Sequence, residues 1–91
     1  MSVPFDPDWC IRPGETLRDW REENGLGTGA AATTCAMTRE EYERVEAGKR
    51  RISTVIACKL QHGTGIPARL WLNLERIYRA ALAAGKKDVS R

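Results

Sequence analysis

The sequence has few of the residues from which catalytic and metal sites are usually built. Its single histidine is His62, and its three cysteines, Cys10, Cys35 and Cys58, are widely spaced and include no CxxC pair. This spacing argues against a zinc site and against a disulfide framework. No Ser/His/Asp group, glycine-rich phosphate loop or facing pair of carboxylates is present, so we expect neither an enzyme nor a cofactor. Since Cys35 and Cys58 fall at apolar helical positions, both are expected in the core.

Long apolar segments are also missing. No run of apolar residues approaches the length of about 20 residues that a membrane-spanning helix needs. No basic segment is followed by an apolar one, as in a signal peptide. The sequence therefore predicts a cytoplasmic protein with no membrane contact. At 91 residues the chain is long enough for one domain, which an oligomer would help to stabilise.

Charge is distributed unevenly along the chain. Residues 1–37 carry three basic and six acidic side chains, residues 38–47 carry two and four, and residues 48–91 carry ten and two. The net charge of +3 therefore conceals a strongly basic C-terminal half. Such a half favours an anionic partner, although a basic helix face exposed only to solvent remains the alternative.

Helical patterns account for most of the chain, and no strand pattern or internal repeat is found. Leu17 and Trp20 give the first helix an apolar stripe, and Gly63 and Gly65 are expected to end the fourth. The five predicted helices cover about residues 14–23, 28–35, 38–47, 53–61 and 67–84, with Pro13 in the first turn of the first helix. We therefore predict an all-α fold, a compact five-helix bundle.

The segments outside the helices give the predicted domain boundaries. Residues 1–12 form a proline-rich arm that is expected to pack on the bundle, with Trp9 as a core candidate together with Trp20. Residues 13–84 form the domain itself, and residues 85–91 are expected to be a fraying polar tail.

Residues 28–45 have the spacing of two helices joined by a tight turn at Ala36 and Met37. Thr38 opens the second of these helices, and Thr38 with Glu41 matches the S/T-x-x-E capping box. Gly48 is expected to end that helix in the left-handed conformation. Small or apolar residues occupy the positions that a helix-turn-helix buries, which are Ala31, Cys35, Met37, Tyr42 and Val45. The second helix of such a motif enters the major groove of DNA.

The exposed face predicted for this second helix is unusually acidic for a surface that meets phosphates. It carries Arg39, Glu40, Glu43 and Arg44. One interpretation is direct base recognition, in which an arginine binds guanine and a carboxylate accepts from cytosine. The other is a solvated face held by the i, i+4 pairs Arg39–Glu43 and Glu40–Arg44.

Three further motifs carry a family resemblance over about residues 11–80. They are Arg12, Pro13, Gly14 and Glu15; the segment 48–53, which reads GKRRIS; and Trp71, Leu72, Asn73 and Leu74 followed by Tyr78. Together they resemble the HigA antitoxin family within the Cro and lambda-repressor (XRE) class of helix-turn-helix proteins. The resemblance implies a lambda-repressor-like fold and a dimeric DNA-binding regulator of a bacterium, phage or plasmid. Such a protein represses its own promoter and often neutralises a partner toxin.

The resemblance also implies which residues contact double-stranded DNA. Base contacts fall on Thr28, Arg39, Glu40 and Glu43, and Thr38 begins the recognition helix. Phosphate contacts fall on Arg44, Lys49, Arg50 and Arg51. Leu70, Trp71, Leu74, Ile77 and Tyr78 would form core and part of a homodimer seam. The alternative is a protein-interaction module on the same fold, with weak or lost DNA binding, whose acidic helix binds a basic partner such as a toxin.

Overall fold

Five helices make up most of the molecule, as the sequence predicts. The computed structural model describes residues 8–90, so the first seven residues of the N-terminal arm lie outside it. The helices are α1 (Pro13–Glu23), α2 (Thr28–Thr34), α3 (Arg39–Glu46), α4 (Thr54–Thr64) and α5 (Ala68–Ala83). Two short strands, β1 (Trp9–Cys10) and β2 (Lys87–Asp88), form a parallel pair. Within residues 8–90, no helix is long and apolar enough to cross a membrane.

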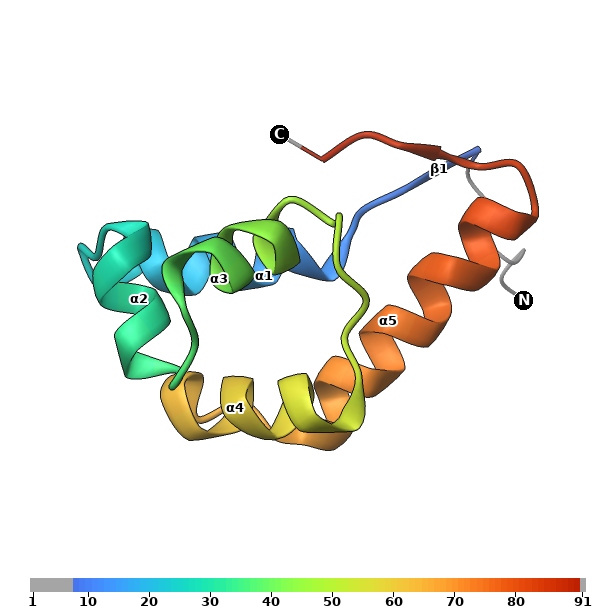
Figure 1. Cartoon of the computed structure of the whole chain (residues 1–91). Helices are drawn as coiled ribbons and strands as arrows, with labels where there is room; N and C mark the ends of the chain where they lie inside the picture. The colour runs from blue at the N-terminus through green and yellow to red at the C-terminus, as the bar shows by residue number, and fades with distance from the viewer. Residues whose placement is uncertain (1–7, 91) are drawn as a thin grey trace, which may run out of the picture.

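The core is assembled from one face of each helix. Leu17 of α1, Tyr42 of α3, Ile56 and Leu60 of α4 and Trp71 of α5 are all fully buried. Figure 1 shows α2 and α3 side by side at one end of the bundle, with α4 beneath them and α5 running up to the terminal strands. Helix α4 contacts both α2 and α5, whereas α3 packs against α1 and α2.

The ends of α3 follow the predicted caps. The Thr38 side chain accepts a hydrogen bond from the Glu41 amide at 3.1 Å. At the other end, Gly48 has φ 77°, and the Lys49 amide donates to the Arg44 carbonyl at 2.9 Å. This arrangement satisfies the last carbonyls of the helix in a Schellman motif. The Glu41 carboxylate, however, pairs with basic side chains of other segments, so only half of the predicted capping box is formed.

Gly63 does not end α4, contrary to the sequence prediction. The helix continues to Thr64 and ends at Gly65, which has φ 78°. A Cβ atom on Gly63 would overlap the Cys35 sulfur and lie 2.9 Å from the Cys35 Cα. Gly63 therefore allows α4 to approach the end of α2 closely, which is a packing role within the helix.

Two residues expected in the core are exposed. Cys58 lies on the outer side of α4, whereas Ile56, Ala57 and Leu60 face the core. The two cysteine predictions thus divide: Cys35 is buried, and its burial raises the pKa of the thiol to about 11. Trp9 is 43% exposed because it lies in a strand at the edge of the bundle.

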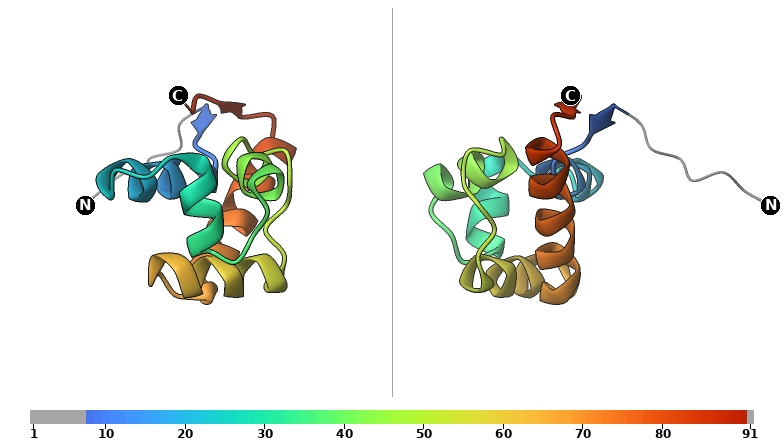
Figure 2. Two further views of the ribbon diagram at one scale, coloured as in Figure 1. Left: turned by 60° about the vertical axis from the view of Figure 1, so that its left-hand side comes forward. Right: turned by 90° about the vertical axis from the view of Figure 1, so that its right-hand side faces the viewer.

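The two ends of the described chain are joined in what we call the terminal clasp: β1, β2, Arg12 and Ser90. The Asp88 carboxylate accepts hydrogen bonds from the Tyr78 hydroxyl at 2.6 Å and from Arg12 Nη1 at 3.3 Å. The Arg12 amide donates to Ser90 Oγ at 3.0 Å. Figure 2 shows the strands lying side by side next to the end of α5. Residues 87–90 are therefore ordered against the bundle, and the expectation of a fraying tail is wrong for them.

Candidate nucleic-acid interface

The turn between α2 and α3 lies at Ala36 and Met37, where the sequence predicts it. Ala36 has φ 57°, the left-handed region in which glycine is usual. The Met37 amide donates to the Ala32 carbonyl at 2.8 Å and closes the end of α2. The predicted inner positions are all buried, namely Ala31, Cys35, Met37, Tyr42 and Val45. This packing fixes α3 against α2 and leaves the other side of α3 to solvent.

Three of the predicted base-contacting residues meet at the N-terminal ends of α2 and α3. The Thr28 hydroxyl donates to Glu43 Oε2 at 2.8 Å, and Arg39 Nε donates to the same oxygen at 3.1 Å. These bonds, that from Thr28 first, lower the pKa of the Glu43 carboxyl. The Arg39 side chain remains 72% exposed. Glu43 thus orients Thr28 and Arg39 on one outer surface, and the predicted Arg39–Glu43 pair is confirmed.

The second predicted pair is not formed. Among residues 8–90, no ion pair joins Glu40 to Arg44, and both residues are exposed. Thr38 is exposed too, but its hydroxyl oxygen is already used to cap α3. Glu40 is therefore the carboxylate of α3 that is exposed and makes no ion pair within the described residues.

The basic segment after α3 is only partly available for phosphate contacts. Arg50 lies 3.6 Å from Glu41 Oε2, and Lys59 of α4 lies 3.4 Å from Glu41 Oε1. Lys49 and Arg51 are exposed, and within the described residues neither makes an ion pair. The sequence does not indicate that Lys59 pairs with Glu41, because 18 residues separate the two and no local spacing links them.

The last carboxylate of α3 is held by α1. Arg21 donates to Glu46 through two nitrogen atoms, each at 2.9 Å, and both side chains are mostly buried. Burial, and then the charge of Glu46, raise the pKa of Tyr42 beside them. Three of the four α3 carboxylates are thus paired with basic side chains. Glu46 pairs with Arg21, Glu43 pairs with Arg39, and Glu41 pairs with both Arg50 and Lys59. The acidity read from the sequence of α3 is largely neutralised in the fold.

The five residues of α5 that are predicted to form the core or a dimer seam differ in their burial. Trp71 is fully buried and Tyr78 nearly so, which places both in the core of a single chain. Leu70 is 43% exposed and Ile77 is 51% exposed. Leu74 is half-buried against the core.

Comparison with known proteins finds a likeness among solved structures. No family model and no curated protein matches the sequence. Among solved structures, the fold resembles that of a candidate antidote protein of a plasmid maintenance system from Nostoc punctiforme. The two chains are 28% identical, the match covers 85% of each, and the TM-score is 0.79. The likeness therefore extends over most of the chain and is not confined to α2 and α3.

Proposed function

We propose that this chain is a DNA-binding transcriptional regulator of the antitoxin type, related to the HigA-like XRE proteins, that acts as a homodimer on its own promoter. In this proposal α2 and α3 form the helix-turn-helix, and the N-terminal part of α3 enters the major groove. Thr28, Arg39 and Glu43 would read bases. The likeness to a candidate antidote protein supports the antitoxin part of the proposal.

The observation that carries the proposal is the pairing of the α3 carboxylates. With Glu41, Glu43 and Glu46 all paired, little uncompensated negative charge remains on the helix. Arg44, Lys49 and Arg51 are exposed and make no ion pair within residues 8–90. Exposed cations of this kind supply the phosphate contacts on which DNA affinity mainly depends.

A gel-shift titration of the full chain on the DNA upstream of its own gene tests the proposal. Binding should weaken as salt is raised, since phosphate contacts release counterions. The variant Lys49→Ala/Arg51→Ala should flatten the logarithmic salt slope by about two units, one for each lost contact. Arg69→Ala/Arg76→Ala removes the same charge from α5 and should leave the slope unchanged. If the wild type does not bind this DNA even at low salt, the proposal is wrong.

A protein-interaction module remains the second candidate. Arg39 and Arg50, which the sequence assigns to DNA, are each engaged by a carboxylate, and Glu40 is exposed without a partner within the described chain. Such a surface could bind a basic protein such as a toxin. The Glu40→Gln variant should then slow association with that partner, because exposed charges act chiefly on the on-rate.

A further inference from the structure

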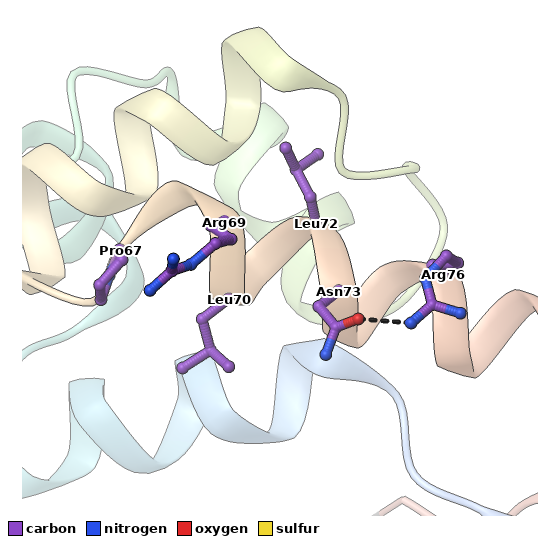
Figure 3. A pocket seen from close by; sticks show the side chains of 6 residues that line it. All are labelled: Pro67, Arg69, Leu70, Leu72, Asn73 and Arg76. Atoms are coloured by element: carbon purple, nitrogen blue, oxygen red, sulfur yellow. Dashed lines mark hydrogen bonds between the residues drawn. The ribbon is translucent and has the colours of Figure 1, made fainter.

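A groove on α5 lies outside the surface assigned to DNA. It has a volume of about 560 Å³ and lies between side chains of the first half of the helix (Figure 3). Its lining consists of Pro67, Arg69, Leu70, Leu72, Asn73 and Arg76. The exposed Leu70 supplies apolar surface, and Figure 3 shows Leu70 and Leu72 projecting from different sides of the helix. None of these residues belongs to α2, α3 or the segment between α3 and α4.

Two arginines on this groove lack acidic partners. Within residues 8–90, the Arg69 side chain makes no hydrogen bond or ion pair, and the Arg76 side chain donates only to Asn73 Oδ1, at 2.5 Å. The neighbouring Arg79 differs, because Glu75 on the buried side of the helix pairs with it. The separation of seven positions from Arg69 to Arg76 corresponds to about 10 Å along the helix. The groove therefore presents two uncompensated guanidinium groups, two turns apart, beside apolar side chains.

We propose that this groove binds an acidic amphipathic segment of a partner protein. This inference rests on the proposed function in one respect, since it supplies the chemistry of the partner that an antitoxin would bind. Arginine favours carboxylates because its planar group can donate two parallel hydrogen bonds to one carboxylate. A helix with carboxylates two turns apart and leucines between them matches both arginines and covers Leu70. Nucleic acid fits less well, since the sugar–phosphate backbone offers no apolar side chains to cover Leu70.

The test uses a fluorescein-labelled helical peptide that has glutamates two turns apart with leucines between them. Its binding to the full chain is followed by fluorescence anisotropy. We expect saturable binding by the wild type, and a loss of about tenfold or more in affinity for Arg69→Ala/Arg76→Ala. A twin peptide with lysine in place of each glutamate should not bind. Both arginines are exposed, so circular dichroism should show an unchanged fold.

The matched control is Lys49→Ala/Arg51→Ala, which removes the same charge from the proposed DNA surface. It should bind the acidic peptide like the wild type while losing DNA affinity. Arginine-dependent peptide binding by a chain that does not bind DNA would support this inference and reject only the proposed DNA-binding function. Three results would each overturn the inference: no peptide binding by the wild type, equal binding of both peptides, or conversion of a dimer to monomer by Arg69→Ala/Arg76→Ala. The last result would show that a second copy of the chain occupies the groove.

Discussion

Glu43 is the residue on which the interpretation of α3 depends most directly. Its carboxylate holds Thr28 and Arg39 together, at 2.8 Å and 3.1 Å. Glu40, one residue from Arg39 along the same helix, holds nothing within the described chain. The two glutamates thus differ in role although they look alike in sequence, and their glutamine variants form a matched pair.

Glu40→Gln should tighten binding to DNA of any sequence, because it removes a negative charge near phosphates and breaks no contact. Glu43→Gln should tighten general binding as well, but it should also weaken the preference for the cognate site, by about 1–3 kcal/mol, because Arg39 is no longer held for base contact. Titrations of both variants on cognate and random DNA measure this difference. An unchanged cognate-to-random ratio for Glu43→Gln would mean that the cluster does not take part in recognition.

At the residue scale, local spacing predicted some of the contacts within one element, but it gave none of the contacts between elements. Arg39–Glu43 and Glu40–Arg44 have the same spacing on α3, and among the described residues only the first pair is formed. The Arg39–Glu43 pair follows from a separation of four residues on one helix. The position of the turn at Ala36 also follows from the spacing of residues 28–45. The pairing of Glu41 with Lys59 joins two helices, so it depends on how they pack. Cys58 was misplaced for a related reason: helical periodicity shows that α4 is apolar but does not show which side faces the core.

Among the elements, the terminal clasp links the N-terminal strand, the C-terminal strand and α5. Burial alone would raise the pKa of Asp88, but hydrogen bonds from Ser90, Tyr78 and Arg12 outweigh it and lower the pKa to about 2. Burial and the bond to Asp88 raise the pKa of Tyr78 to about 12. Because the pKa of the Asp88 carboxyl is lower in the folded chain than its usual value of 3.8, the ionised form of Asp88 stabilises the fold.

The clasp should therefore weaken in acid. The stabilisation is complete above the usual pKa of an aspartate and is lost as the pH falls through about 2. At neutral pH, Asp88→Asn should lower the free energy of unfolding by about 1–3 kcal/mol, because charge-assisted hydrogen bonds are lost. Urea unfolding of both proteins at neutral pH and near pH 2 checks this, with Lys87→Gln as a control on the same strand. A deficit of the same size at both pH values would contradict the assigned role of the Asp88 charge.

At the scale of elements, the helices were predictable and the strands were not. Helices α1 to α5 each span about two turns or more, so their apolar residues recur with the helical period. Caps such as Thr38 and Gly48 mark where a helix begins and ends. Strands of two residues contain no period, and β1 and β2 pair across almost the whole chain. Gly63 shows the same limit, since its tolerance inside α4 depends on contact with Cys35.

For the molecule as a whole, exposed positive charges of the C-terminal half lie on two different elements. Lys49 and Arg51 lie on the segment between α3 and α4, whereas Arg69 and Arg76 lie on α5. The sequence shows that the C-terminal half is basic but does not show which of its basic side chains are paired with carboxylates in the fold. The proposed DNA contact and the proposed acidic partner would therefore use different side chains of one chain.

The proposed regulator should associate into a dimer. A single DNA-binding domain of this size makes few contacts with phosphates, and specific DNA binding at physiological salt usually needs more such contacts. Light scattering at micromolar concentration should therefore return about twice the chain mass of 10.2 kDa. Ile77, which is 51% exposed on α5 and lies outside the groove lining, is the proposed contact between copies. Ile77→Glu should give a monomer with greatly reduced affinity for the upstream DNA.

Val55→Glu is the control for this variant, because Val55 is 65% exposed on α4 and its replacement adds the same charge. It should leave both the mass and the DNA affinity unchanged. A dimer reading two half-sites should also lose binding when about five base pairs, half a helical turn, are inserted between them, whereas a full turn of about ten should be tolerated better. A wild-type chain that is monomeric and binds DNA regardless of this spacing would contradict the dimer.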